Sequence, residues 1–596
     1  MRLFNELKRR NVLRVAVAYV VSAWLIIQVA ETILPQYGLE HYVRTVITVL
    51  AIGFVPAMIL AWALEWTPEG IRVDDGAEAA GDGAGAVRAG RRFDRIVIVI
   101  LTIALAWFVY DKLVPPAPEV RYSIAVLPFS NESPDALPDY LADGLAGEVR
   151  DLLAKLPQLL VIERSPAFSF RGQGLATSEI GKRLGVSHLL TGAVTQLGDR
   201  VRVRAQLLDA ADGKSRWSKD YTGTLADIFA IQDEIAGDVT KGLAIQAGES
   251  LPKARRTTLE VLALTLQAKK LWDDNVNNAD TEAMTALLDE ALEIDPNYTP
   301  AMVWKIYANW SARRQGLITR EEEDERWLKL AGRILAIEPE NGSVHNMFAW
   351  QAMYVDKDLQ AATASYARAL RSEPNDAEIL RHASRFALLI GQKEDALAMS
   401  ERSMAVDPLC TLCLYEASRI NMYAGQLDKA EALRARFISL RGEGHYQYGL
   451  MKLLQGKAAE AVTVFREEEA RMAQAGFPDA AGQARVGLAM AFHDLGRAEE
   501  SDELLARYID DYGEQYPREV AQVYAWRGEK DLAFEWFYRA DETGPDRESM
   551  LIANPLFAKL HDDPRWAAIL EERGFSEARL AALEFPVELL TQYHSE

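Results

Sequence analysis

Cysteine is almost absent from this chain, which has 596 residues and only two cysteines, Cys410 and Cys413. A framework of disulfides therefore cannot hold the fold together, and the fold must depend on apolar cores. Histidine is also scarce, because the eight histidines are scattered and show no H-E-x-x-H or similar spacing. The chain lacks a G-x-S-x-G nucleophile motif as well. We therefore expect no catalytic residues, no cofactor and no metal site.

A glycine-rich phosphate loop is also lacking. The first apolar strand pattern, residues 123–129, is followed by a turn without glycine that carries Glu132, Asp135 and Asp139. A phosphate cradle needs glycines where the backbone approaches the phosphates, and acidic side chains there would repel the ligand. This stretch is therefore expected to begin a folded domain and not to bind a nucleotide.

Positive charge is in deficit. The chain has 66 Lys and Arg against 87 Asp and Glu. Twelve of the basic and eleven of the acidic residues lie in residues 1–114, so the rest of the chain carries a net charge of −22. A surface of this sign repels phosphate backbones, and we expect no nucleic-acid partner.

Three long apolar segments distinguish the beginning of the chain: residues 12–34, 44–66 and 95–114. Each has about the 20 residues that a helix needs to cross the hydrocarbon layer of a membrane. They predict a membrane anchor over residues 1–115 that lies in the lipid bilayer. A cleaved signal peptide is a poorer interpretation, because the first apolar run is too long and no small-residue cleavage pattern follows it.

The cations beside these segments predict an orientation. They lie before the first segment and between the second and third: Arg2, Lys8, Arg9, Arg10, Arg14, Arg72, Arg88, Arg91, Arg92 and Arg95. Because such flanks stay in the cytoplasm, the N-terminus is expected there and everything after residue 114 on the far side. In a bacterium this means a multi-pass protein of the inner membrane whose C-terminal domains are periplasmic.

Alternating strand and helix patterns follow in residues 120–247. Two strand patterns at 187–197 and 200–210 are separated by Gly198-Asp199, which favours a tight hairpin. With the strands at 123–129, 159–165 and 215–223, they predict a small α/β domain with a mixed sheet of about five strands.

From about residue 256 to 573 the chain shows only helical patterns with a period near 34. A glycine followed five residues later by a small residue recurs in several units: Gly391/Ala396, Gly425/Ala430, Gly456/Ala461, Gly496/Ser501 and Gly528/Ala533, with Asp356/Ala361 at the same offset. The glycine permits a turn between two helices and the small residue lets them pack closely. Seven or eight helical pairs in an all-α solenoid are predicted, followed by a C-terminal tail over residues 574–596.

These patterns resemble a known combination of domains. The runs SIAVLPF, LADGLAGEVRDLLAKLP, LLVIERSPAFSFRGQG and IGKRLGVSHLLTGAV resemble the TolB-like domain of bacterial envelope proteins, and the helical units resemble tetratricopeptide (TPR) repeats. The resemblance implies a multi-domain inner-membrane protein with three transmembrane helices, a TolB-like domain and a TPR solenoid. It also implies an interaction module without catalytic residues.

Three residues at equivalent repeat positions are candidates for partner binding. Trp350, Arg385 and Arg419 have the same offset in successive units, so they are expected to stack on neighbouring helices. They could form a ladder in the TPR groove that holds an acidic or C-terminal carboxylate ligand. The alternative is that the arginines are surface residues paired with this chain's own carboxylates.

Cys410 and Cys413 have the C-x-x-C spacing at the start of a helix. Redox motifs share this spacing, but no strand leads into the helix, and two sulfurs without a nearby histidine pair make a weak zinc site. A structural role, including a local disulfide, is the favoured interpretation.

The sequence therefore predicts a membrane-anchored scaffold, not an enzyme, that displays TolB-like and TPR domains in the periplasm. Its expected partners are other envelope proteins or peptides, bound through the TPR groove. The alternative is a sensory or regulatory subunit of a signalling system, related to cyclases or transcription regulators in domain order but without a catalytic domain of its own.

Overall fold

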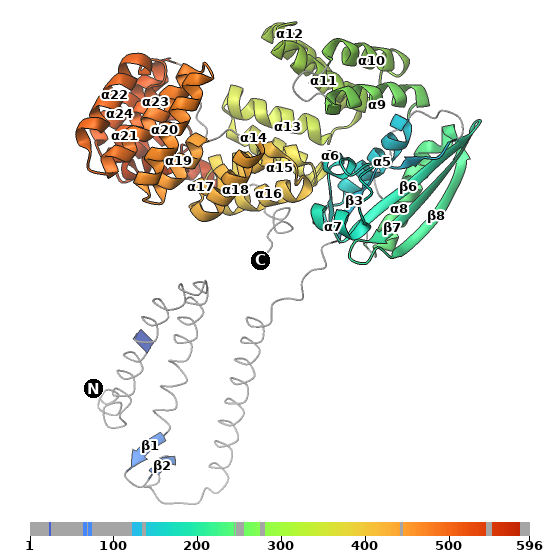
Figure 1. Ribbon diagram of the computed structural model, residues 1–596, viewed down its shortest axis with the longest axis horizontal. Helices are drawn as coiled ribbons and strands as arrows, with labels where there is room; N and C mark the ends of the chain where they lie inside the picture. The colour runs from blue at the N-terminus through green and yellow to red at the C-terminus, as the bar shows by residue number, and fades with distance from the viewer. Residues whose placement is uncertain are drawn as a thin grey trace, which may run out of the picture. The chain divides into compact units, whose positions relative to one another are not determined.

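The computed structural model describes residues 122–133, 139–243, 245, 256–274, 280–441, 445–543 and 551–583, with the short stretches 23–24, 64–67 and 70–73. The chain separates into two compact units, residues 1–117 and 118–596. In the second unit an α/β domain precedes a long array of helices (Figure 1).

The described part of the first unit is a short hairpin. Strands β1 (Leu64–Thr67) and β2 (Gly70–Val73) pair in antiparallel register. The last residues of the predicted span 44–66 therefore form a strand. The remainder of the three predicted spans lies outside the described residues, apart from Ala23 and Trp24, which are helical.

The prediction of three transmembrane helices is not supported and is corrected. Within the described ranges, no helix combines the length and the apolar character that a bilayer crossing requires. Helix α12 (Arg320–Ile337) has the length, with 18 residues, but it begins with seven consecutive charged residues. Such a segment is too costly to place in hydrocarbon. The fold class is therefore an α/β domain with a small mixed sheet followed by helical repeats, and the multi-pass inner-membrane location is withdrawn.

The α/β domain is built on a mixed sheet with the strand order β5-β3-β6-β7-β8. β3 runs parallel to β5 and β6, whereas β6, β7 and β8 form antiparallel hairpins, and the short β4 pairs with β6. The elements are β3 (Tyr122–Val126), β4 (Ser130–Asn131), α5 (Asp139–Ala154), β5 (Leu159–Val161), α6 (Arg164–Phe168), α7 (Thr177–Leu184), β6 (His188–Leu197), β7 (Arg200–Asp209), β8 (Ser215–Thr224), η2 (Leu225–Asp227) and α8 (Ile228–Gly242). The mixed sheet predicted from the sequence is present.

Helices cover both faces of this sheet. Apolar residues of α5 at helical spacing, among them Leu145, Val149 and Leu153, are buried in one core with α8 and the strands. A second, smaller core contains Ala125 of β3 with Ile180 and Leu184 of α7. Strands that run parallel need this two-sided cover, which explains their nearly continuous apolar sequence.

The helical array consists of eight successive pairs in the described residues. They are α9 (Leu259–Asp274) and α10 (Thr281–Ile294), α11 (Thr299–Arg314) and α12, α13 (Gly342–Gln351) and α14 (Leu359–Ser372), α15 (Ala377–Leu389) and α16 (Lys393–Val406), α17 (Thr411–Tyr423) and α18 (Leu427–Arg441), α19 (His445–Leu454) and α20 (Ala458–Gln474), α21 (Pro478–Asp494) and α22 (Ala498–Tyr512), and α23 (Pro517–Arg527) and α24 (Lys530–Thr543). This is the repeat architecture of TPR proteins.

The predicted glycine marker has the predicted geometry. All five glycines lie between the two helices of a pair and have φ angles of 72° to 86°. The small residues five positions later are at most 1% exposed. In the pair Asp356/Ala361 both predicted positions are wrong by one residue. Lys357 has the positive φ, 55°, and Ala362 is the buried small residue. The shift arises because a π-helical turn, η3 (Ala352–Asp356), extends the first helix.

The end of the described chain packs on the array. η4 (Pro555–Leu560) and α25 (Pro564–Glu572) place Phe557 and Trp566 in one core with Phe537 of α24. The short α26 (Glu577–Ala581) follows. Of the predicted tail, Phe575 is buried in the core of the third and fourth helix pairs, and residues 584–596 lie outside the described residues.

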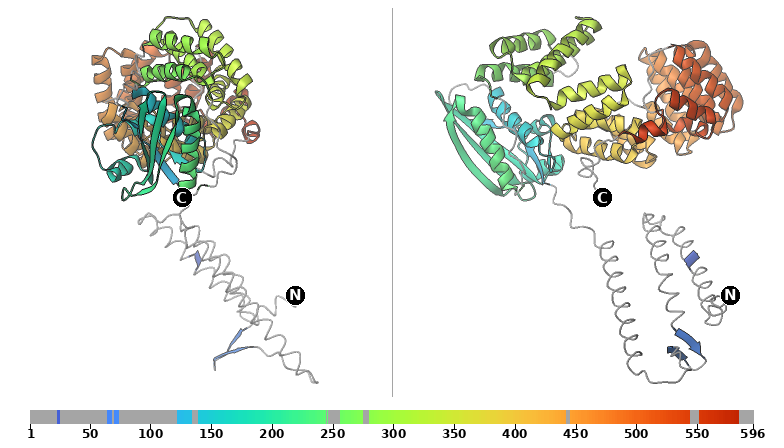
Figure 2. Two further views of the ribbon diagram at one scale, coloured as in Figure 1. Left: turned by 90° about the vertical axis from the view of Figure 1, so that its right-hand side faces the viewer. Right: turned by 180° about the vertical axis from the view of Figure 1, so that it is seen from behind.

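The α/β domain lies against the earlier half of the array (Figure 2). The buried Asn375 side chain, between α14 and α15, donates from Nδ2 to the carbonyl oxygens of Ala154, Leu156 and Leu159 at 2.8 to 3.1 Å. The backbone N–H of Glu163 donates to the carbonyl of Val406 at 2.9 Å. The two parts are thus joined by buried hydrogen bonds as well as by apolar packing.

Candidate functional site

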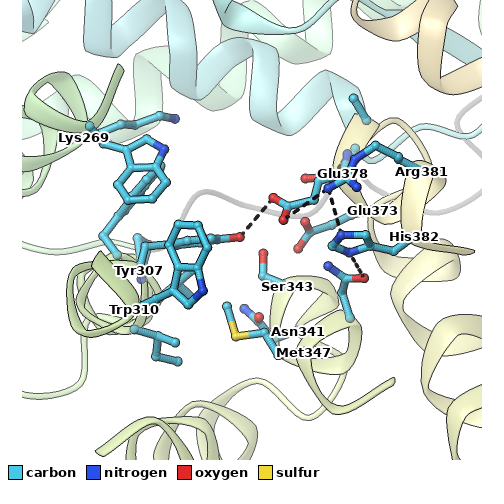
Figure 3. Close-up of a pocket in the computed structure, with 18 of the residues that line it drawn as sticks. Lys269, Tyr307, Trp310, Asn341, Ser343, Met347, Glu373, Glu378, Arg381 and His382 are labelled. Carbon is cyan, nitrogen blue, oxygen red and sulfur yellow. Dashed lines mark hydrogen bonds and ion pairs between the residues drawn. The ribbon is translucent and has the colours of Figure 1, made fainter. Parts of the chain in front are cut away.

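A cavity of about 1820 Å³ lies between the α/β domain and the first five helix pairs, and Figure 3 shows part of it. Helix α5 supplies one side. The first helices of successive pairs, α9, α11, α13 and α15, supply most of the remainder, with contributions from α12 and the beginning of α17. In a helical solenoid these first helices line the inner surface, on which partners commonly bind.

Four aromatic side chains form one part of the lining, the aromatic wall: Trp272 of α9 and Trp304, Tyr307 and Trp310 of α11. Neighbouring ring centroids are 5.4 to 6.2 Å apart. The residues of α11 recur every third position, which places them on one face of the helix. The ammonium of Lys269 lies 5.6 Å from the ring centre of Trp304, within the range of a cation–π interaction.

Large apolar side chains stay exposed in this cavity. Five of those that line it are 39% to 61% exposed: Trp310, Leu328, Trp350, Val355 and Leu412. An apolar surface that gathers in one hollow is typical of a binding site, since covering it releases about 25 cal/mol per Å².

Carboxylates gather beside the aromatic wall, and we call them the carboxylate wall: Glu148 and Glu163 from the α/β domain, Glu373 and Asp376 from the turn between α14 and α15, and Glu378 from the first turn of α15. The Tyr307 hydroxyl donates to Glu378 Oε2 at 3.4 Å, and Figure 3 shows Glu373 next to this pair. The Asp376 carboxylate accepts the backbone N–H groups of Glu378 and Ile379, so it caps α15.

Burial raises the pKa of two members of this wall to about 7. For Glu148 the neighbouring Asp151 adds to the effect of burial, and for Glu373 the neighbouring Asp376 does so. Arg150 reaches across the wall and forms ion pairs with Asp151 at 2.6 Å and Glu163 at 2.9 Å. Arg150 therefore serves two carboxylates, and Lys155 and Lys269 also act on this group, Lys269 from 3.8 Å to Asp151.

A neutral histidine lies at the edge of the carboxylate wall. The Arg381 guanidinium donates to His382 Nε2 at 2.8 Å, so the imidazole hydrogen is on Nδ1, which donates to Asn346 Oδ1 at 3.2 Å. Burial, together with the charges of Arg381 and Arg385, lowers the pKa of His382 well below its usual value. His382 thus adds no positive charge to the cavity.

The three candidate residues from the sequence lie on successive first helices. Trp350 lines the cavity and its ring packs on Tyr354, with centroids 5.0 Å apart. Arg385 lies over the same Tyr354 ring at 5.2 Å and has Glu416 at 4.0 Å. Arg419 pairs with Glu416 at 2.7 Å. Both arginines are thus occupied by a carboxylate of this chain, and neither lines the cavity.

Cys410 and Cys413 form a disulfide in the structure. Cys410 also caps α17, since its sulfur accepts the backbone N–H of Cys413 at 2.9 Å. Both residues border the cavity. Among the residues that the structure describes, no group of three or more His, Cys, Asp or Glu side chains is arranged to hold a metal ion.

The aromatic and carboxylate walls were not found by sequence reasoning. The spacing of Trp304, Tyr307 and Trp310 is a signal that could have identified the first wall, because three aromatics on one face exceed what a repeat core needs. The second wall gave no signal, since its members come from residues 148–163 and 373–378 and meet only through the docking of the α/β domain.

Comparison with known proteins adds a limited similarity. No family model matches the chain. Over 191 residues it is 34% identical to a protein of Rhizobium meliloti (strain 1021) named "Putative adenylate cyclase 3", a match that covers 31% of this chain. The chain spans about a third (32%) of the length of this curated relative.

Solved structures with similarity include three helical proteins. They are the MamA protein (16% identity, 30% of this chain and 94% of that one, TM-score 0.25), the type IV pilus biogenesis factor PilW (16%, 45% and 99%, 0.27) and a tetratricopeptide repeat protein from Parabacteroides merdae ATCC 43184 (13%, 46% and 100%, 0.29). TM-scores this low carry no weight for function. The TPR-type fold is evident from the helix pairs themselves.

Proposed function

We propose that this protein is a scaffold that binds a segment of another protein in the cavity between the α/β domain and the first helix pairs. The observation that carries the proposal is the set of five exposed apolar side chains in a hollow of about 1820 Å³. A side chain that is exposed in the free protein and lies in a cavity gains free energy when a partner covers it. The action proposed is binding, without a chemical reaction.

The finer features of this proposal come from the sequence. The α/β domain is proposed to be TolB-like, which is supported by the resemblance of its strand and helix sequences. That the partners are envelope proteins rests on the same resemblance. Trp350 belongs to the proposed site through its place in the lining, whereas a ligand role for Arg385 and Arg419 would require both to leave Glu416.

A crosslinking experiment tests the proposal. Dodecapeptides selected on the full chain from a random library are offered to variants with benzoylphenylalanine at Val355, inside the cavity, or at Phe477, which is exposed on a later helix pair. We expect crosslinks from position 355 and not from 477. Crosslinks from position 477 alone, or a library that yields no binder, would contradict the proposal.

A regulatory subunit is the second candidate, because the 34% identity over 191 residues relates part of this chain to a protein named for cyclase activity. In this second proposal the same cavity binds a signalling enzyme, and binding changes the catalytic activity of that enzyme. Cyclic AMP measured in cells that co-produce this chain and an adenylate cyclase of their own would differ between the wild type and Trp310→Ser/Leu412→Ser. Equal levels would leave the scaffold as the better proposal.

A further inference from the structure

We infer that the segment bound in the cavity is basic: a Lys or Arg side chain enters between the aromatic and carboxylate walls while flanking apolar residues cover the exposed apolar side chains. This inference rests on the proposed function and specifies the chemistry of its ligand.

The first observation is that the carboxylate wall has acidic groups without partners. In the described part of the chain, the carboxylates of Glu148 and Glu373 accept no hydrogen bond and form no ion pair within 4 Å. Both line the cavity and both are only partly exposed. Glu378, with 47% of its side chain exposed, has only the distant Arg381, at 4.0 Å, as an ionic partner. A ligand cation would supply the missing hydrogen-bond donors.

The second observation is the nature of the neighbouring surface. A cation is stabilised over aromatic rings as well as beside carboxylates. The protein already shows this arrangement with its own Lys269, whose ammonium lies 5.6 Å from the Trp304 ring and 3.8 Å from Asp151. Trp310 and Tyr307 continue the ring surface towards Glu378 and Glu373 (Figure 3). A second cation beside these residues would have the same environment.

The third observation concerns three arginines of the lining, which are engaged within the protein. Arg150 pairs with Asp151 and Glu163, Arg313 pairs with Glu323, and Arg381 donates to His382. Burial raises the pKa of Glu148 and Glu373 although nearby cations, Lys155 among them, act in the opposite direction, so a further cation beside these carboxylates would be favourable. An acidic ligand would bring a further negative charge to buried carboxylates and be repelled.

The experiment measures the affinity of the full chain for three synthetic dodecapeptides by fluorescence anisotropy. All have leucine on one face of a helix, and the other face carries Lys, Glu or Ser. The protein variants are Glu148→Gln/Glu373→Gln, which keeps shape and removes charge, and Glu467→Gln, a matched control for an exposed carboxylate on α20. Trp310→Ser/Leu412→Ser removes apolar surface from the cavity.

We expect the Lys peptide to bind at least about tenfold more tightly than the Ser peptide, and the Glu peptide to bind more weakly than both. The double Gln variant should weaken the Lys peptide about tenfold or more, and Glu467→Gln should leave it unchanged. If the apolar variant abolishes binding while the double Gln variant keeps the full affinity for Lys, or if the Glu peptide binds best, the basic ligand is refuted and the peptide site stands. If the apolar variant also keeps full affinity, the peptides bind elsewhere and both proposals fail.

Discussion

Asn375 makes three of the buried hydrogen bonds that join the two parts of the second unit. Its side chain is completely buried, its Nδ2 group donates to three carbonyl oxygens of the α/β domain, and its Oδ1 accepts from Arg402. These carbonyls belong to Ala154, Leu156 and Leu159, at the end of α5 and the start of β5. The Leu156 carbonyl also accepts the backbone N–H of Leu159, and the Leu159 carbonyl also accepts from the Arg402 guanidinium. The side-chain amide of Asn375 bonds all three carbonyls.

We expect Asn375→Ala to lower the free energy of unfolding by about 2–4 kcal/mol, because it removes the buried hydrogen bonds to three carbonyl groups and the acceptor that Asn375 offers to Arg402. Urea denaturation followed by circular dichroism measures the change. The control is Asn297→Ala, at an exposed asparagine before α11, which should stay within about 0.5 kcal/mol of wild type. A loss no larger than that of the control would contradict the role assigned to Asn375.

The pKa values of Glu148 and Glu373 predict how stability changes with pH. Both are raised from 4.5 to about 7, so between these values the native state binds more protons than the unfolded chain. Stability should therefore fall as the pH rises from about 5 to 8. We expect Glu373→Gln, which cannot ionise, to be more stable than wild type at pH 8 by about 1–3 kcal/mol and to show a smaller decline.

Thermal melting at pH 5, 6, 7 and 8 is the measurement. Glu467→Gln should follow wild type throughout, since that carboxylate is exposed on α20. A difference between Glu373→Gln and wild type that does not change with pH would show that this carboxylate titrates near its ordinary value.

At the scale of elements, the turn between the helices of a pair depends on backbone conformation alone. Gly425, between α17 and α18, has a φ of 86°, and a Cβ added there would meet nothing within 4 Å. Gly332, in the middle of α12, has equally open surroundings but ordinary helical geometry. Because neither position offers a steric clash, a comparison of alanine at the two glycines measures the effect of backbone conformation alone.

We expect opposite effects from the same substitution at these positions. Gly425→Ala should destabilise by about 1 kcal/mol, because an L-residue resists the left-handed region. Gly332→Ala should stabilise by about 0.5–1 kcal/mol, because alanine loses less backbone entropy in a helix. Urea denaturation of both variants checks the signs, and a stabilising effect at Gly425 would contradict the assigned conformation.

At the scale of the whole second unit, the cavity exists because the α/β domain docks on the repeats. Leu160 of β5 packs on the core of the third and fourth helix pairs. Glu163, just beyond β5, bonds through its backbone to Val406 at the end of α16. A change that weakens this docking should open the cavity without unfolding either part.

We expect Leu160→Asp to separate the two parts, because a charge would be buried in the apolar interface. Small-angle X-ray scattering should show a larger radius of gyration, while circular dichroism keeps its helix and strand signals. The matched control is Leu197→Asp at the end of β6, where leucine is 68% exposed and the substitution should change neither quantity. An unchanged radius for Leu160→Asp would mean that the interface tolerates the charge.

Apolar length alone misled the prediction for the N-terminal part. Residues 44–66 have the composition of a membrane helix, but Leu64–Thr67 pair with Gly70–Val73 in a hairpin. The apolar composition of a 20-residue segment does not show that its last residues pair as a strand with the residues that follow. The predicted turn at Asp356 was wrong by one residue for a similar reason, since a single π turn shifted the register without changing the period.

The sequence by itself determined the features that depend on local spacing. The Gly and small-residue markers of five helix pairs and the succession of strands in residues 122–224 depend on short separations, where propensity and periodicity act directly. Tertiary structure alone decided the site. Asn375 meets residues more than 200 positions away, and the aromatic and carboxylate walls come together only when the α/β domain docks. Because this docking depends on burial and on hydrogen bonds between distant segments, no local pattern in the sequence encodes it.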